Sequence, residues 1–269
     1  MEQQAGARRR AEWFRLCFVV VVLALAGLTS VAQPPAPAAG DSAAQIYARK
    51  NTFGIIGAYS WDSNHILLGE AERRMLVNIG VAYSRRLLIN RFVNWQYDGE
   101  LLPVSLESDP LTYYVNQETS PVKGTYSGTL PDSPVTCAPL SAVYSYTIDN
   151  VTYSGTETFG CSGRQWTIGE AISPAGMQWN FLPARKLQPI VVGHGGYMYT
   201  TRSIPVGGAG NFNFTFDIGV GIEIFRSKGR SIRAEYRYHH ISNHETAALN
   251  PGIDNGLLQV TYCFRFGRQ

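Results

Sequence analysis

The chain has little charge for its size. Asp, Glu, Lys and Arg make up 16% of its 269 residues, against about 25% in an average soluble domain, and the net charge is only +3. A protein that neutralises nucleic-acid phosphates needs a clustered excess of Lys and Arg, which this sequence does not have. With 45% apolar residues as well, the composition argues against a nucleic-acid binder and against an ordinary cytosolic enzyme.

The sequence also lacks an apolar run long enough to span a membrane as a helix. The longest run, residues 16–28, has about 13 residues, against the ~20 that a spanning helix needs. It follows an arginine-rich segment at 8–15 and precedes Ser30-Val31-Ala32, a small-x-small cleavage pattern. We therefore predict a signal peptide at residues 1–32, with an uncleaved anchor as the alternative, and a Pro/Ala-rich linker at 33–44.

Cysteine is scarce, with four residues in all. No CxxC pair or Cys/His cluster has the spacing of a zinc site, so we expect no metal. Cys17 falls in the predicted signal peptide, and Cys263 lies alone in an apolar alternating segment, which favours a small buried side chain. Cys137 and Cys161 flank a Tyr/Thr/Ser-rich stretch, and we predict that they form a disulfide in an oxidising compartment.

What the sequence has in place of long runs is alternation. Apolar residues alternate with polar or small ones at a period of two, which is typical of a β-strand with one apolar face. The clearest case is 212–224, whereas 189–200 is Gly-rich. Strands of about ten residues, even in number, suit a tilted crossing of a bilayer. The eight alternating segments are 53–61, 75–84, 93–100, 177–181, 189–200, 212–224, 232–239 and 258–266.

The connections between these segments alternate in length, as in outer-membrane barrels with short periplasmic turns and long external loops. The short, Arg/Lys-containing connections are 85–90, 183–188 and 226–230, and the long ones are 61–73, 101–173, 201–210 and 241–255.

We therefore predict an all-β fold, an eight-stranded antiparallel transmembrane β-barrel over residues 45–269. Residues 101–173 are predicted to be an extracellular surface-loop insertion between the third and fourth strands, with a hairpin turning at Asp149-Asn150. A secreted barrel with its apolar face inside is the alternative that the pattern alone leaves open.

One region gathers the groups that acyl transfer needs. His240 and Ser242 are two apart on a predicted strand, so they share a face and lie ~6–7 Å apart along it. That face is the apolar outer one of Tyr236, and Asp254 has the outward parity of Leu258 on the next strand. Serine, histidine and an acid can form a catalytic triad, and polar groups facing lipid are costly. By spacing alone, polar residues at the barrel rim remain the alternative.

The same region carries a family resemblance. Residues 238–243 (Tyr-His-His-Ile-Ser-Asn) and 250–254 (Asn-Pro-Gly-Ile-Asp) resemble the C-terminal motif of the lipid A 3-O-deacylases, the PagL-type family, also described as acyloxyacyl hydrolases. The family pattern is His-x-Ser-Asn, a loop with Asn, Pro and Gly, and an acid twelve positions after the serine, where this chain has Asp254. The family has glutamate there, which is one methylene longer. The resemblance is expected to cover the eight strands but not 101–173.

This resemblance implies an eight-stranded outer-membrane barrel that hydrolyses the 3-O-linked 3-hydroxyacyl chain of lipid A. Lipopolysaccharide would be the substrate, and the active site would face the outer leaflet. Ser242 would be the nucleophile, His240 the general base and Asp254 the residue that orients His240. Asn243, with Asn250 as the second candidate, would help to stabilise the oxyanion. Neither a metal nor an organic cofactor is implied.

Two other functions stay open at this stage. One is a non-catalytic barrel, an adhesin or structural protein, whose long insertion binds a partner. The other is an esterase of the same fold that acts on another lipid. The shared outward parity of His240, Ser242 and Asp254 favours an enzyme, because an adhesin has no need of it. The sequence leaves the oligomeric state open, a homodimer included.

Overall fold

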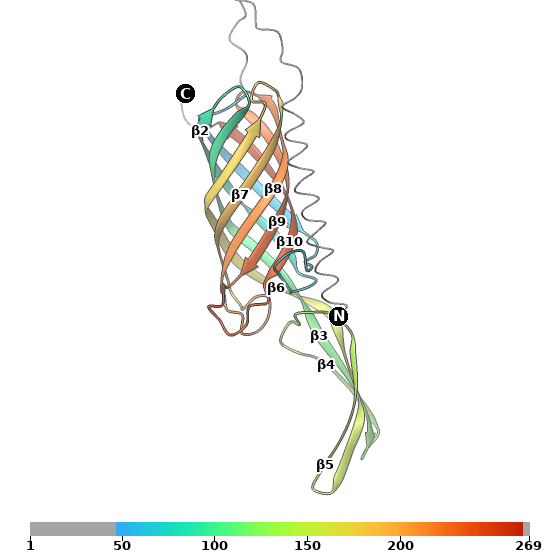
Figure 1. Ribbon diagram of the computed structural model, residues 1–269. Coiled ribbons are helices and arrows are strands. Elements are labelled where there is room, and N and C mark those ends of the chain that lie inside the picture. The colour runs from blue at the N-terminus through green and yellow to red at the C-terminus, as the bar shows by residue number, and fades with distance from the viewer. Residues whose placement is uncertain (1–46, 266–269) are drawn as a thin grey trace, which may run out of the picture. The chain divides into compact units, whose positions relative to one another are not determined.

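The computed structural model describes residues 47–265, so the predicted signal peptide (1–32) and linker (33–44) lie outside the described residues. The described chain is built from antiparallel β-strands (Figure 1). Within it, no helix is long and apolar enough to cross a membrane. The strands are β1 (Asn51–Ser60), β2 (Met75–Ile89), β3 (Val93–Ser120), β4 (Gly124–Thr129), β5 (Leu140–Ile148), β6 (Val151–Phe181), β7 (Leu187–Thr200), β8 (Phe212–Ser227), β9 (Arg230–Ser242) and β10 (Ile253–Arg265).

Eight of these strands form a closed ring. Antiparallel pairings run from β1 through β2, β3, β6, β7, β8 and β9 to β10, and β10 pairs back with β1. The eight segments predicted from the alternation correspond to these eight strands in order. A ring in which every wall strand has two neighbours leaves no unpaired edge. The prediction of an all-β, eight-stranded antiparallel ring is therefore confirmed.

Side chains on the wall alternate between an apolar exterior and a polar interior. In β8, Ile218 and Val220 are each 50% exposed, whereas Asp217 and Glu223 are buried. Large apolar side chains are exposed in the same way on every wall strand from β1 to β10. The interior is polar, so the alternative of a barrel with its apolar face inside is wrong.

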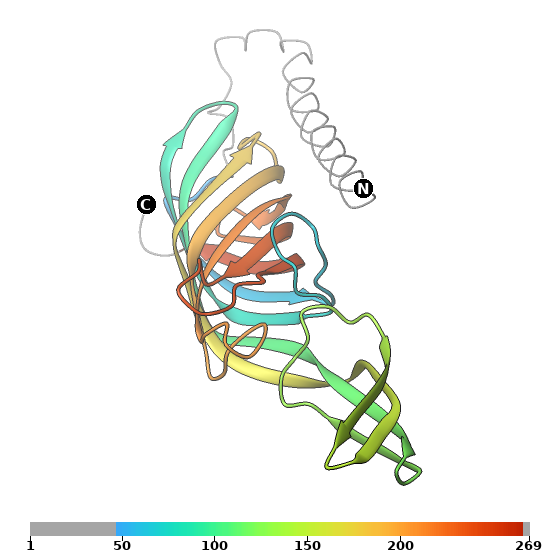
Figure 2. The same cartoon turned by 60° about the horizontal axis from the view of Figure 1, so that its bottom comes forward.

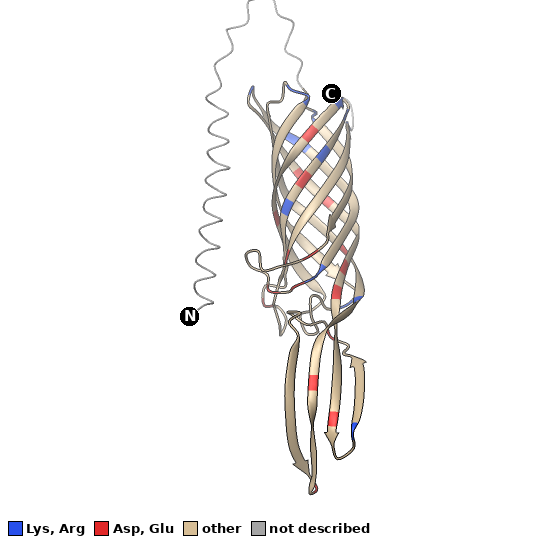
Figure 3. Cartoon of the chain, turned by 90° about the vertical axis from the view of Figure 1, so that its right-hand side faces the viewer, with Lys and Arg blue, Asp and Glu red and all other residues tan. Residues whose placement is uncertain are grey.

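Charged groups in the interior pair with one another, and Figure 3 marks the charged positions along the wall strands. Arg237 lies 2.8 Å from Glu100 and 2.6 Å from Glu235, and Arg233 lies 3.0 Å from Asp98. Breaking such a pair would leave an uncompensated buried charge, which costs about 3–5 kcal/mol. The charged residues on the inward face of these strands are therefore explained by the ion pairs that they form with one another inside the barrel.

The predicted surface-loop insertion at 101–173 is only partly correct. β3 still pairs with β2 at Ser108, and β6 already pairs with β7 at Gly169, so both ends of this range are barrel wall. The register shifts between Leu102 and Ser105 in β3, where a bulge reverses the inward parity. The strand therefore continues, although its period-two pattern is interrupted.

The rest of this range is a sheet and not an irregular loop. β4 pairs with β3, and β5 pairs with β6, which gives a four-stranded extension in the order β4-β3-β6-β5 (Figure 2). The predicted hairpin is confirmed, because β5 and β6 join at Asp149 and Asn150, whose φ values of 50° and 63° suit a two-residue turn. A disulfide between Cys137 and Cys161 ties the β4–β5 connection to β6.

The antiparallel order places the connections at two ends of the barrel. The connections 61–74, 201–211 and 243–252, and the extension, lie at one end, which we call the loop end. The short turns 90–92, 182–186 and 228–229 lie at the other. Long connections on one side and short turns on the other agree with the predicted alternation of lengths.

Candidate active site at the loop end

His240 and Asp254 face each other across β9 and β10. They are direct partners in the register of the two strands, and Nδ1 of His240 lies 2.6 Å from Oδ1 of Asp254. An ionised carboxylate only accepts hydrogen bonds, so Nδ1 is the donor. The other ring nitrogen, Nε2, is then the basic one in a neutral imidazole. This pair has the geometry of a base and the acid that orients it.

Ser242 is the last residue of β9 and lies on the same outward face as His240. Tyr238, His240 and Ser242 are partly exposed, whereas His239 and Ile241 between them are buried. Across residues 47–265, no hydrogen bond joins Ser242 Oγ to His240. Contacts of this kind are often long before substrate binds and tighten in the substrate complex. Ser242 and His240 therefore lie on the same outer face of the barrel wall.

The connection 61–74 covers Asp254, a contact that the sequence analysis missed. The backbone N–H groups of Leu67 and Leu68 donate to Oδ2 of Asp254 at 2.6 and 2.8 Å, and the hydroxyl of Tyr238 donates to Oδ1 at 2.8 Å. Asp254 has the outward parity but is fully buried beneath this connection. Donors on both oxygens favour the ionised carboxylate and fix its position.

Gly69 allows this close approach. A Cβ at this position would lie 2.5 Å from the backbone nitrogen of Asp254 and 2.7 Å from the carbonyl carbon of Ile253. The next residue, Glu70, donates its N–H to the carbonyl of Pro251 at 2.7 Å, so the connection runs against the chain just before β10. The only sequence signal for this contact was a single glycine in a loop. A glycine alone does not indicate which part of the chain packs against it.

The side chain of Asn243 is buried between two connections of the loop end. Its side-chain amide donates to the carbonyls of Ala209 and Leu249 at 2.5 and 2.6 Å, and it is 1% exposed. Its backbone N–H donates to Oδ1 of Asn250 at 3.1 Å. This arrangement leaves the amide nitrogen of the exposed Asn250 without a hydrogen-bond partner among residues 47–265. Of the two asparagines, Asn250 thus has the available donor, while Asn243 joins two loops.

Arg74 is a second buried link at the loop end. Its guanidinium pairs with Asp109 at 3.2 Å and donates to the carbonyls of Pro134 and Pro205 at 2.5 and 2.9 Å. One side chain thereby connects the covering segment 61–74, the base of the extension and the connection 201–211. Satisfied buried polar networks of this kind rigidify their surroundings.

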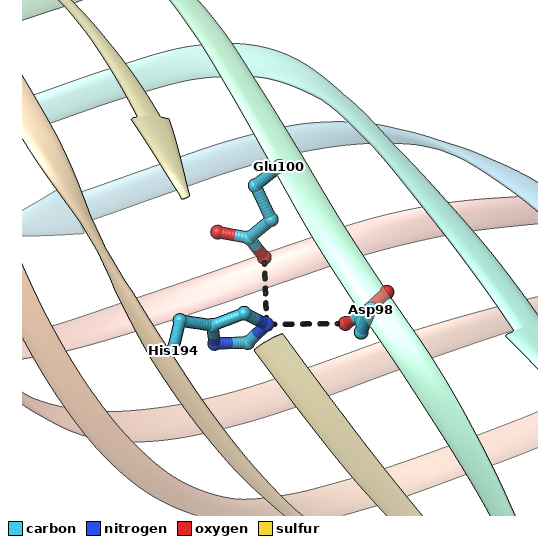
Figure 4. A group of neighbouring side chains, drawn as sticks. All are labelled: Asp98, Glu100 and His194. Carbon is cyan, nitrogen blue, oxygen red and sulfur yellow. Dashed lines mark hydrogen bonds and ion pairs between the residues drawn. The ribbon is translucent and has the colours of Figure 1, made fainter. Parts of the chain in front are cut away.

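The barrel interior holds a separate group of side chains that could hold a metal ion (Figure 4). One ligand atom each from Asp98, Glu100 and His194 lies within 4.8 Å of the others. The two carboxylates already pair with Arg233 and Arg237, and His194 bonds Asp217 at 2.9 Å through Nδ1. The donors are thus committed to a charge network, which favours a structural role for this group.

Comparison with known proteins bears on the loop-end site. Residues 141–262 match the family model described as "Lipid A 3-O-deacylase (PagL)". This stretch, which is less than half of the chain, is similar to the PagL family. The matched stretch includes His240, Ser242 and Asp254, so the predicted resemblance is confirmed where the motif lies. The match begins at residue 141, within the range 101–173 that we expected the resemblance not to cover. It does not include β1, β2 or β3.

Two solved structures are similar to this chain. The crystal structure of the outer membrane enzyme PagL has 10% identity and a TM-score of 0.44, and the match covers 79% of this chain and 99% of that one. The crystal structure of Neisserial surface protein A has 11% identity and a TM-score of 0.37, with 81% and 97% covered. A comparison with curated protein sequences found no match.

Proposed function

We propose that this protein is an outer-membrane esterase that hydrolyses the 3-O-linked 3-hydroxyacyl chain of lipid A. The observation that carries the proposal is the His240–Asp254 hydrogen bond beside Ser242, on the apolar outer wall of the barrel. The PagL-family match over the same residues supports this substrate. A triad on the outer wall can reach a lipid without extracting it from the membrane.

The exterior of the barrel supports the membrane location. Rows of exposed apolar side chains on neighbouring strands, such as Ile218, Val220 and Ile222 on β8, would make a large apolar surface in water. A closed ring also satisfies the wall's backbone groups without water, as a bilayer requires. We propose that the wall strands cross the outer membrane and that the loop end lies outside the cell, next to the outer leaflet.

In the proposed reaction, Ser242 Oγ attacks the ester carbonyl carbon while Nε2 of His240 takes the hydroxyl proton. Asp254 stabilises the imidazolium that forms. The tetrahedral intermediate collapses as the bond to the sugar oxygen breaks, and His240 returns the proton to that oxygen. Water, activated by His240, then hydrolyses the acyl-serine, which releases a 3-hydroxy fatty acid and regenerates Ser242.

We assign the oxyanion contact to Asn250 and a positioning role to Asn243. A donor that stabilises the developing oxyanion must be free to point at it, and loss of one such donor costs about 10²–10³ in kcat. The amide of Asn243 already bonds two backbone carbonyls, whereas that of Asn250 is free to donate. This modifies the sequence-based expectation, in which Asn243 was the main donor.

The function is tested by expression in a host that makes lipopolysaccharide, followed by mass spectrometry of its lipid A. We expect lipid A to lose the mass of one 3-hydroxyacyl chain, with the free 3-hydroxy fatty acid recovered. Unchanged lipid A in cells whose outer membrane contains the folded barrel, shown by heat-modifiable gel migration, would overturn the proposal.

Gly69→Ala is expected to slow hydrolysis by about 10²-fold, because displacement of a catalytic group by about 1 Å has this cost. The added methyl group meets backbone atoms, so segment 61–74 must move away from Asp254. Gly57→Ala is the matched control, since a Cβ there meets nothing within 4 Å. Initial rates of fatty-acid release measure the effect, and equal rates for both variants would show that the covering segment does not matter.

The topology can be tested with single cysteines. In intact cells, an impermeant thiol reagent is expected to label a cysteine placed at the exposed Ala248, in the connection 243–252. A cysteine at the exposed Lys228, in a short turn at the other end, should react only after lysis. The natural Cys263 is buried, which keeps background labelling low. The reverse pattern would place the loop end in the periplasm.

A further inference from the structure

One side of the extension carries six aromatic residues. Cross-strand partners in a sheet point to the same side, and the register Tyr114–Phe159, Tyr144–Gly155 and Tyr146–Tyr153 places these rings together. We call this side the aromatic face. Its aromatic residues are Tyr114, Tyr126, Tyr144, Tyr146, Tyr153 and Phe159.

Two rings on the aromatic face, those of Tyr144 and Tyr114, lie over glycines of the neighbouring strands. A Cβ on Gly155 would lie 2.7 Å from the hydroxyl of Tyr144, and one on Gly128 would lie 2.9 Å from the ring of Tyr114. The Tyr144 hydroxyl reaches across Gly155 to donate to Asn116 at 2.9 Å. Gly155 and Gly128 therefore leave room for the rings of Tyr144 and Tyr114 to rest on the neighbouring strands.

The outer side of this face is open. Tyr126 and Tyr146 are 54% and 51% exposed, and the rings of Tyr146 and Tyr153 stack with centroids 5.4 Å apart. Tyr144 also stacks on Tyr146, with centroids 5.8 Å apart, and an exposed patch of large rings commonly marks a binding surface. The opposite side of the same strands carries mainly Ser, Thr and Val, for example Val143 and Thr147, so the two sides differ in chemistry.

The charge on the aromatic face selects the kind of partner. Glu118 and Glu157 share the face with Asn116, and no Lys or Arg occurs in the paired strand segments 113–120, 124–129, 140–148 and 151–160 that form it. Lys123, in the exposed turn between β3 and β4, is the cation next to this face in sequence. Two carboxylates against this one terminal cation disfavour phosphate groups and anionic headgroups. Carboxylate and amide oxygens do accept hydrogen bonds from hydroxyl groups. Aromatic faces, being negative, attract the polarised C–H groups of a sugar ring.

We propose that the aromatic face binds the neutral polysaccharide part of the lipopolysaccharide whose lipid A is the proposed substrate. The choice of this glycan rests on the proposed function. β3 and β6 run without interruption from the barrel wall into the extension, at the end that carries His240 and Ser242 (Figures 1 and 2). The face therefore stands beyond the loop end, on the side where the sugar chain of a lipid held at the site would extend.

The test uses the full-length protein in detergent and the polysaccharide released from lipopolysaccharide by mild acid, which contains no lipid A ester. Calorimetric titration is expected to show binding to the wild type. The double variant Tyr144→Ala/Tyr146→Ala should bind about tenfold more weakly, because two stacking contacts are removed. Thr147→Ala, on the opposite side of β5, is the matched control and should bind like the wild type.

A kinetic measurement separates this proposal from the catalytic one. The double variant should raise KM for lipopolysaccharide with a full sugar chain, and should leave hydrolysis of isolated lipid A unchanged. If the wild type bound the polysaccharide but hydrolysed neither lipopolysaccharide nor isolated lipid A, only the catalytic proposal would be wrong. Absence of wild-type binding, an equal loss in Thr147→Ala, or an effect of the tyrosines only on self-association of the protein would overturn the glycan proposal.

Discussion

Ser242→Ala should lower release of 3-hydroxy fatty acid from lipid A by about 10⁴-fold or more, with the barrel still folded. The oxygen that attacks the ester is lost, and the activity left in serine hydrolases without their triad comes from substrate binding and oxyanion contacts. Ser242 is partly exposed at the end of β9, so its hydroxyl is not needed for the wall. Rates with the purified protein in detergent, together with heat-modifiable gel migration, measure both quantities.

His240→Ala and the double variant Ser242→Ala/His240→Ala test whether the two residues act together. Residues that act as one catalytic unit give losses that do not add, so Ser242→Ala/His240→Ala should be no slower than the slower single variant. Ser145→Ala, at an exposed serine of the extension, is the matched control and should keep full activity. Losses that multiply in the double variant would mean that the two residues act independently, contrary to the proposed mechanism.

Asp254→Asn should lower kcat by about 10⁴-fold, as in a serine hydrolase that loses the charge behind its histidine. Both oxygens of Asp254 accept hydrogen bonds from N–H or O–H donors. The amide NH₂ of asparagine must therefore face a donor, either at His240 and Tyr238 or at the backbone of Leu67 and Leu68. The imidazole loses its orienting charge, and one set of contacts is broken.

Two milder changes, one at Asp254 and one at its hydrogen-bond donor Tyr238, separate the effect of the carboxylate's charge from the effect of its contacts. Asp254→Glu keeps the charge, so it should retain far more activity than Asp254→Asn. Tyr238→Phe removes one donor to Asp254 and should slow hydrolysis much less, since a hydrogen bond to a charged group contributes about 1.5–3 kcal/mol. Single-turnover rates measure all three variants, and an Asp254→Asn rate equal to that of Tyr238→Phe would show that the charge is not needed.

The barrel was predictable because its physical cause is local. An apolar exterior and a polar interior impose a period of two on every wall strand, and segment 212–224 shows it without interruption. The ends of β3 and β6 were not predictable in this way. The bulge after Leu102 reverses the parity. Beyond the barrel neither side of the sheet is buried, so the alternation there separates aromatic residues from Ser, Thr and Val and does not follow the apolar and polar pattern of the wall.

The site was predictable only within β9 and β10. Parity placed His240 and Ser242 on one face, and the hairpin register then brings Asp254 opposite His240. The cover over Asp254 comes from a connection nearly 190 residues away in sequence (Leu67 to Asp254, 187 residues). Such a contact leaves no periodic signal, and Gly69 alone does not reveal what it approaches. The position of the Asn243 amide likewise depends on backbone carbonyls of two loops, which no sequence motif indicates.

The central claim is that His240, oriented by Asp254, activates Ser242 on the outer wall of the barrel. The most direct measurement is labelling of the purified wild type with a serine-reactive fluorophosphonate, followed by peptide mass spectrometry. We expect the label on Ser242, and we expect it to be lost in His240→Ala, in which Ser242 is still present. Equal labelling of Ser242 with and without His240, or an unlabelled Ser242 in protein that still deacylates lipid A, would contradict the account.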